Sequence, residues 1–151
     1  MFHGVHNINM DAKGRMAMPT RLREPLQALC EGRIVVTIDT QTNCLVIYPY
    51  PEWEIIAAKI EALPDMQPIT RRFKRLKLGY ASELELDGNG RVLLPPPLRE
   101  YAKLEKKLML AGIGNKLELW SEDLWQGECE QALQDSLAGE ELPDELRTLT
   151  L

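Results

Sequence analysis

A nine-residue motif occurs twice in this chain, and it constrains the fold more than any other feature of the sequence. The first copy occupies residues 11–19 and the second residues 87–95, 76 positions later. Each copy reads Asp-x-x-Gly-Arg, followed by three apolar residues and a proline. Over residues 11–24, seven of fourteen positions are identical at this offset. Internal repetition at a fixed spacing predicts two related half-domains.

The residue types of the motif predict its local structure. An aspartate can bond the backbone two residues further on, and a following glycine can adopt positive φ, so the pair predicts a tight turn. The arginine directly after the glycine is then held near the tip of this turn. The three apolar residues predict a short buried strand, which the proline ends before a helix begins.

A β-hairpin is predicted after each motif. Residues 33–38 and 44–48 are short, apolar and rich in β-branched residues, and a turn separates them. Residues 108–110 and 117–120 repeat this pattern at an offset of 72. One copy is too small to bury much core alone. We therefore expect the two copies to pack about a pseudo-twofold axis as one closed, barrel-like β structure.

Helices are predicted between and after the hairpins, which makes the chain an α+β protein with flanking helices. Apolar residues recur at helical spacing over residues 52–63 and again over 69–80, and residues 124–137 predict a third helix. A helix after the first motif, with Thr20 as a candidate N-cap, is expected to be short or broken at Pro25 and to continue to about Leu29.

This organisation predicts four segments along the chain. They are a first module at residues 5–52, a helical linker at 53–80, a second module at 81–124, and an acidic C-terminal helix and tail at 125–151.

The net charge of −5 conceals a division between two parts of the chain. Residues 1–117 hold 17 Lys and Arg against 13 Asp and Glu, whereas residues 118–151 hold one Arg against ten acids. A mildly basic body with an acidic tail is compatible with nucleic-acid binding by the body. No apolar run approaches the roughly 20 residues of a membrane-spanning helix, and no signal pattern opens the chain, so a cytosolic protein without membrane contact is expected.

The sequence holds no recognisable catalytic or metal-binding set. It contains no P-loop, GxSxG or HExxH motif, and both histidines, His3 and His6, lie near the N-terminus, where surface positions are expected. The three cysteines are far apart and form no CxxC pair. We therefore predict no enzyme activity, no cofactor and no metal.

The basic residues around the first motif are candidates for DNA contacts. Lys13 and Arg15 flank Gly14, and Arg21 and Arg23 follow shortly after. Glycine lets the backbone approach a phosphate, and arginine can grip a phosphate or a guanine edge with two parallel hydrogen bonds. The alternative is that Arg15 pins the turn by pairing with Asp11, and that the other cations are merely solvated.

A second basic group lies at residues 71–77. It can be the solvated face of an amphipathic helix, or it can offset the acidic tail of a neighbour in an assembly.

The two motifs and their flanks resemble the MraZ family, which is built from two SpoVT-AbrB-type swapped-hairpin modules. Further support comes from residues 1–4 (MFHG), the segment from Tyr48 to Trp53, residues 78–81 (LGYA) and residues 117–120 (LELW). The resemblance covers almost all of the chain in the expected order.

This resemblance implies a bacterial transcriptional repressor of the cell-division and cell-wall gene cluster, including its own gene. It implies a cytosolic, nucleoid-associated homo-oligomeric ring whose N-terminal modules face double-stranded DNA with short G-rich direct repeats. Lys13 and Arg15 would face DNA, with Arg91 as the second motif's counterpart, while Asn89 replaces the lysine there. The alternative is an antitoxin-like or other protein-binding module that uses the acidic residues 118–151 to hold a basic partner.

Overall fold

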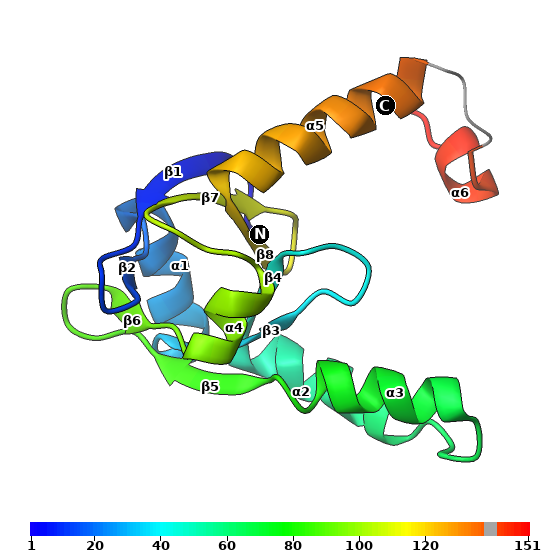
Figure 1. Cartoon of the computed structure of the whole chain (residues 1–151), viewed down its shortest axis with the longest axis horizontal. Helices are drawn as coiled ribbons and strands as arrows, with labels where there is room; N and C mark the ends of the chain where they lie inside the picture. Colours follow the sequence, from blue (N-terminus) through cyan, green and yellow to red (C-terminus); the bar gives the residue numbers. More distant parts are fainter. Residues whose placement is uncertain (138–141) are drawn as a thin grey trace.

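The structure, a computed structural model, describes residues 1–137 and 142–151, and these form an α+β fold (Figure 1). The α+β part of the predicted fold class is therefore confirmed. In chain order the elements are β1 (Val5–Asn9), β2 (Arg15–Ala17), α1 (Thr20–Cys30), β3 (Arg33–Ile38), β4 (Leu45–Pro49), α2 (Tyr50–Glu61), α3 (Pro68–Lys77), β5 (Ser82–Glu85), β6 (Arg91–Leu93), α4 (Pro96–Tyr101), β7 (Lys107–Gly112), β8 (Leu117–Ser121), α5 (Glu122–Leu137) and α6 (Asp144–Arg147).

Six strands form one antiparallel sheet in the order β1-β7-β8-β4-β3-β5. Exchanging each strand for its counterpart in the other half (β1 for β5, β3 for β7, β4 for β8) reproduces the same order. The centre of this symmetry lies at the β4–β8 pair, where Val46 stands opposite its own counterpart, Glu118. Each outer strand pairs with the hairpin of the other half, β1 with β7 and β5 with β3.

The expected closed, barrel-like structure is not present in the part of the chain that the structure describes. The six-stranded sheet is open, with β1 and β5 as its edges, and β2 and β6 form a separate two-stranded ribbon. The sheet stays open because the two strands that could have bridged its edges pair with each other instead. Besides the sheet strand with which it pairs, each edge strand contacts its neighbouring ribbon strand, β1 with β2 and β5 with β6.

The β2–β6 ribbon joins the two motifs directly. Met16 stands opposite its counterpart Val92, and both side chains are buried in the core. Beyond the strands, the N–H of Met18 donates to the carbonyl of Gly90 (2.8 Å), and the N–H of Leu94 donates to the carbonyl of Gly14 (3.0 Å). The two turns are therefore tied to each other through backbone hydrogen bonds.

The core lies on both faces of the sheet because successive strand residues point to opposite sides. Ile34 and Val36 of β3 join the main core, which α1 covers with Leu22 and Leu26. Val35, between them, belongs to a smaller cluster on the other face. In that cluster Tyr48 packs on Trp53 of α2, and the corresponding residues of the second half, Trp120 and Trp125, form a similar aromatic pair.

The first helix departs from the sequence-based expectation. α1 continues through Pro25, and its N-cap is Pro19, with no side-chain cap, so the prediction of Thr20 as N-cap is wrong. Pro25 leaves the carbonyl of Arg21 without its helical partner. Both residues are exposed, so water can satisfy this carbonyl. The corresponding α4 is shorter, in keeping with the four residues that separate the two sequence offsets.

Two helical arms project from the body on the side opposite the β2–β6 ribbon (Figure 1). One arm is α2 with α3, and the other is α5. Residues Asp144–Arg147 of the predicted acidic tail form the short helix α6, while residues 138–141 lie outside the described residues. Among the described helices, none combines the length and the apolar character needed to cross a bilayer.

Candidate nucleic-acid interface

The first motif forms the tight turn that its sequence predicts. Oδ1 of Asp11 accepts hydrogen bonds from the backbone N–H groups of Lys13 and Arg15, both at 2.9 Å. The N–H of Gly14 donates to the carbonyl of Asp11 (3.0 Å), and Gly14 has a φ of +94°. The turn therefore uses the aspartate and the glycine in their expected roles.

The second motif repeats this geometry at Asp87. Its Oδ1 accepts the N–H groups of Asn89 (2.8 Å) and Arg91 (2.9 Å), and Gly90 has a φ of +73°. The two turns differ in the arginine side chain. Arg15 Nε donates to Oδ2 of Asp11 at 2.9 Å, whereas Arg91 Nε lies 3.8 Å from Oδ2 of Asp87.

Hydrogen bonding holds both aspartates in the ionised form. The N–H of Arg15 lowers the pKa of the Asp11 carboxyl, and the N–H of Arg91 does the same for the pKa of Asp87. The charge of Arg15 also contributes to lowering the pKa of Asp87, because the two turns lie close together. Each turn thus holds an ionised carboxylate that orients the arginine four residues later.

The β2–β6 ribbon presents one face to solvent. Arg15 stands opposite Leu93 and Ala17 stands opposite Arg91, and all four side chains are exposed on the face away from Met16 and Val92. The two arginines are diagonal neighbours, with Cα atoms roughly 7–8 Å apart. This face, which we call the arginine ribbon, therefore carries two cations around an apolar centre.

Each turn is also held by an arginine from the other half. Arg99 Nε donates to the carbonyl of Leu94 (2.9 Å), and its guanidinium covers Gly14, where an added Cβ would lie 2.6 Å from Cζ. In the same way Arg23 Nε donates to the carbonyl of Met18 (2.6 Å) and covers Gly90. Positive φ favours glycine at both turns, and an added Cβ would displace the guanidinium that covers each of them.

The structure places the five predicted site residues in three settings. Arg15 and Arg91 lie together on the arginine ribbon, and Lys13 is exposed on the first turn beside them. Arg21 is exposed in the first turn of α1. Arg23 is half-buried and engaged with backbone, which gives it a contact within the fold.

Arg99 is a residue of this region that the sequence did not single out. The sequence does mark this position, since residues 22–24 and 98–100 are identical (Leu-Arg-Glu). That identity marks Arg23 and Arg99 as counterparts, but their role depends on contacts between the two halves.

Both possibilities raised for Arg15 are compatible with its geometry. It pairs with Asp11, yet its side chain remains 43% exposed. Among the described residues, none accepts a hydrogen bond from its terminal nitrogens Nη1 and Nη2. Since a guanidinium can bind a base edge or a phosphate with two parallel N–H groups, the outer edge of Arg15 is available for such a contact.

Acid is expected to destabilise the two turns. Because the folded-state pKa of Asp11 and Asp87 lies below 3.8, their contribution to stability is complete above about pH 3.8 and is lost as pH falls through the lowered pKa. Thermal unfolding between pH 6 and pH 3 should therefore show a weaker pH dependence for Asp11→Asn/Asp87→Asn than for the unaltered protein. The control is Glu54→Gln, an exposed carboxylate on α2. Equal acid sensitivity of all three proteins would contradict this role.

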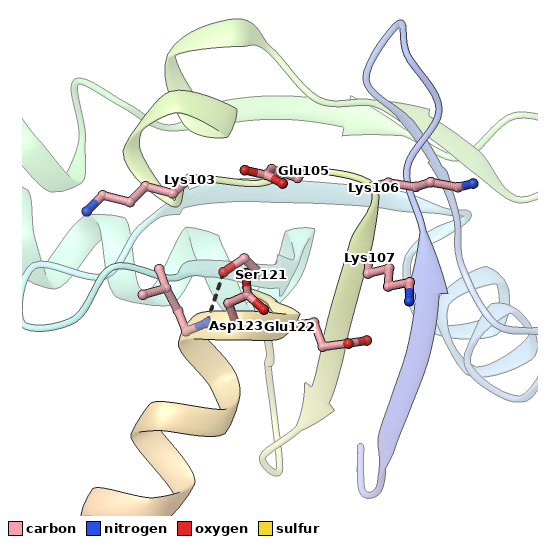
Figure 2. A pocket seen from close by; sticks show the side chains of 8 residues that line it. Lys103, Glu105, Lys106, Lys107, Ser121, Glu122 and Asp123 are labelled. Carbon is pink, nitrogen blue, oxygen red and sulfur yellow. Dashed lines mark hydrogen bonds between the residues drawn. The ribbon is translucent and has the colours of Figure 1, made fainter.

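A cleft of about 450 Å³ lies between the loop before β7 and the start of α5 (Figure 2). Its charged lining consists of Lys103, Lys106, Lys107, Glu105, Glu122 and Asp123. The lysine side chains point in different directions, and Ser121 Oγ accepts the N–H of Leu124 (3.2 Å) at the helix start. With three cations balanced by three acids, the cleft does not favour an anionic ligand.

One group of described residues has metal-ligand chemistry. Ligand atoms of Asp39, Cys44 and Glu118 lie within 4.8 Å of one another. Burial raises the pKa of the Cys44 thiol to about 12, and its Sγ lies 3.3 Å from the hydroxyl of Thr42. The thiolate is the form that binds metals, so an ion at this place would have to displace the proton of Cys44.

The fold and the interface together define a protein of two related halves that display one joint pair of Asp-x-x-Gly-Arg turns. Comparison with known proteins identifies the class. The family model described as "MraZ protein, putative antitoxin-like" matches residues 1–76 and 78–144. This chain belongs to the MraZ family.

Curated relatives match the chain over its full length. Each of the following is named "Transcriptional regulator MraZ". The protein of Halorhodospira halophila is 55% identical over 152 residues, that of Saccharophagus degradans 56% over 151, and that of Pseudomonas aeruginosa strain PAO1 53% over 151. In each comparison, 100% of both chains is covered. The family resemblance seen in the sequence is confirmed.

Proposed function

We propose that this chain is a sequence-specific DNA-binding transcriptional regulator that acts through the arginine ribbon. The names of its relatives support regulation of transcription. The observation that carries the proposal is the pair of exposed arginines, Arg15 and Arg91, on one face of a two-stranded ribbon. The protein has no enzymatic role in this proposal.

The proposed contact places the ribbon in the major groove of double-stranded DNA. This groove is about 12 Å wide and admits a two-stranded β-ribbon. The outer edge of Arg15 would then reach O6 and N7 of a guanine, which is the commonest specific contact of arginine. Leu93 and Ala17, which lie between the arginines, would meet apolar base atoms such as thymine methyl groups.

Lys13 and Arg21 are proposed to position the ribbon by contacting phosphates. Both are exposed, and both belong to the first half. The second half has Asn89 in place of Lys13, so it would contribute fewer phosphate contacts. We assign Arg23 to the same interface as a positioning residue, since it covers Gly90 and bonds the carbonyl of Met18.

A single ribbon of this size offers few phosphate contacts and would bind weakly. We therefore propose that the chain acts as a homo-oligomer, in a ring whose ribbons engage several copies of a short direct repeat. The second ribbon then binds at a high effective concentration, which raises overall affinity without any new contact. In this arrangement a small DNA-binding surface on each subunit is sufficient, because several subunits bind together.

The remaining details of the proposal come from the family resemblance. The repeats would be G-rich, the regulated genes would be the bacterial cell-division and cell-wall cluster including the protein's own gene, and the effect would be repression in the nucleoid. Residues 5–52 and 81–124 would be swapped-hairpin modules, with 53–80 as linker and 125–151 as acidic helix and tail. The pairing of β1 with β7 and of β5 with β3 supports an exchange between modules.

Binding to promoter repeats is expected to depend steeply on salt and on repeat number. Each neutralised phosphate adds about −0.9 to the slope of log K against log salt concentration. When several ribbons bind together, raising the salt from 50 to 200 mM should therefore lower the affinity by roughly 10³-fold or more. Deleting one repeat should weaken binding further. Fluorescence anisotropy with intact, deleted and scrambled repeats measures both effects. Affinity that is unchanged by salt and by deletion would refute the multivalent model.

A protein-binding, antitoxin-like role is the second candidate. Two observations favour it, namely the wording of the family description and the five acids of α5. Capture experiments from cell lysate, with and without nuclease, separate the two functions. Loss of all captured partners after nuclease treatment favours the DNA-binding role, whereas a basic protein retained after treatment favours the protein-binding role.

A further inference from the structure

Helix α3 carries only positively charged side chains, and helix α5 carries only negatively charged ones. α3 holds five cations and no acid, and α5 holds five acids and no cation. The cations are Arg71, Arg72, Lys74, Arg75 and Lys77, and the acids are Glu122, Asp123, Glu128, Glu130 and Asp135. Like charges on one helix repel each other, and such a helix attracts a surface of opposite charge.

Most of these charges are unneutralised within the described chain. The acids of α5 take part in none of its ion pairs, and on α3 only Lys74 has an acidic partner, Asp65 (2.7 Å). Arg71 and Lys77 donate to backbone carbonyls, which satisfies hydrogen bonds but leaves their charge. Arg72 and Arg75 are exposed, and no described residue accepts a hydrogen bond from either.

Apolar residues accompany the free charges on both helices. On α3, Ile69, Arg72 and Leu76 are spaced i, i+3 and i+7, which places them on one face. Ile69 is 69% exposed and Leu76 is 40% exposed, and no residue of α3 is buried. On α5, Glu130 and Leu133 are spaced i, i+3, and Leu133 is 65% exposed. The α3 face thus places one positive charge between two apolar side chains, and the α5 face places one negative charge beside an apolar side chain.

The two helices are placed so that one copy of the chain does not bring them together. α3 contacts β3, whereas α5 contacts β7 and β8. They project as separate arms from the side of the body opposite the β2–β6 ribbon (Figure 1). The complementary surface for each helix is therefore the other helix of a second copy.

We propose that α3 of one copy docks against α5 of the next, with Arg72 facing Glu130 and with Ile69 and Leu76 covering Leu133. This inference rests on the proposed homo-oligomer and names the surface that forms it. The contact joins two different surfaces, so it is head-to-tail and can close into a ring. Because both helices lie away from the ribbon, docking leaves Arg15 and Arg91 free on every subunit.

Charge reversal followed by its compensation tests this interface. The variants are Arg72→Glu/Arg75→Glu, Glu128→Arg/Glu130→Arg, and the combination of all four. Either reversal alone should lower the particle mass toward the 17.2-kDa monomer in light scattering coupled to size-exclusion chromatography. The combination should restore the mass. The control is Lys59→Glu/Lys106→Glu, which reverses two exposed cations elsewhere and should leave the mass unchanged.

Three outcomes would overturn the interface. The mass could be unchanged in both reversals, the combination could stay dissociated while its far-UV circular dichroism matches the unaltered protein, or Arg72→Glu/Arg75→Glu could lose DNA affinity at full mass. The last result would assign α3 to DNA instead. Failure of the proposed function is a separate result, namely that promoter DNA binds neither the unaltered protein nor the full-mass control.

Discussion

Arg15→Ala is expected to lower the affinity for promoter-repeat DNA by about 1–3 kcal/mol per engaged subunit, or roughly 5- to 150-fold, since a bidentate arginine–guanine contact has this magnitude. In an oligomer the losses of several subunits combine, so specific binding should disappear from a gel-shift assay. The fold should survive, because the side chain is 43% exposed and an exposed ion pair such as that with Asp11 adds little stability.

Two further variants give this experiment its controls. Arg15→Lys keeps the charge but removes the planar fork, so it should retain binding to any DNA while losing preference for the repeats. Lys59→Ala removes one exposed cation on α2 and should leave affinity nearly unchanged. Operator binding retained by Arg15→Ala would remove Arg15 from the interface. Arg91→Ala should have a smaller effect, because its half lacks the lysine of the first turn.

Gly14→Ala is expected to destabilise the protein by about 1–3 kcal/mol, the usual cost of a side chain in a positive-φ conformation. At roughly 2–4 °C per kcal/mol for a chain of this size, Tm should fall by about 2–12 °C. The backbone of Gly14 has a φ of +94°, and an added Cβ would lie 2.6 Å from Cζ of Arg99. Arg99 would have to move and could lose its bond to Leu94.

The second turn offers a matched control for this change. Gly90→Ala should destabilise similarly, because its φ is +73° and Arg23 covers it. Gly88 lies in the same turn but has no atom within 4 Å of an added Cβ, so Gly88→Ala should change stability by less than about 0.5 kcal/mol. Thermal unfolding of the three variants decides the matter. Equal stability of Gly14→Ala and Gly88→Ala would refute the proposed strain.

The Arg99 contact can be measured by a double-mutant cycle. If Arg99 covers Gly14 as described, Arg99→Ala should reduce the additional cost of Gly14→Ala, because the obstructing guanidinium is gone. Residues in contact usually show coupling of about 0.5–3 kcal/mol. Additive effects within about 0.3 kcal/mol would show that the cost comes from backbone strain alone.

Sequence reasoning succeeded where structure depends on neighbours along the chain. The turn at Asp11 and Gly14 follows from short-range hydrogen bonding, and β3 occupies the predicted residues Arg33–Ile38 because β-branched residues favour strands. At α1 the sequence predicted the helix itself to about Leu29, but the expected break at Pro25 does not occur. Pro25 lies on the exposed face of α1, while Leu22 and Leu26 are buried in the core.

For the candidate site, the sequence supplied the residues but not their arrangement. It identified Arg15 and Arg91 as counterparts, and it paired Arg23 with Arg99 through their identical flanks. Nothing in the residue order showed that β2 and β6 would form one ribbon, or that each arginine would cover the glycine of the other half. Such pairings join residues 67 to 85 positions apart, where local preferences carry no information.

By itself, the amino-acid sequence determined two turns, two hairpins and the division of charge between the body and the tail, because each of these depends on residue type and short spacing. Only the tertiary structure decided that the sheet is open, that β1 pairs with β7 and β5 with β3, and that α3 and α5 project as separate arms. The physical reason is that strand pairing and helix placement depend on which distant surfaces bury each other, and a repeated sequence offers each strand more than one equivalent partner.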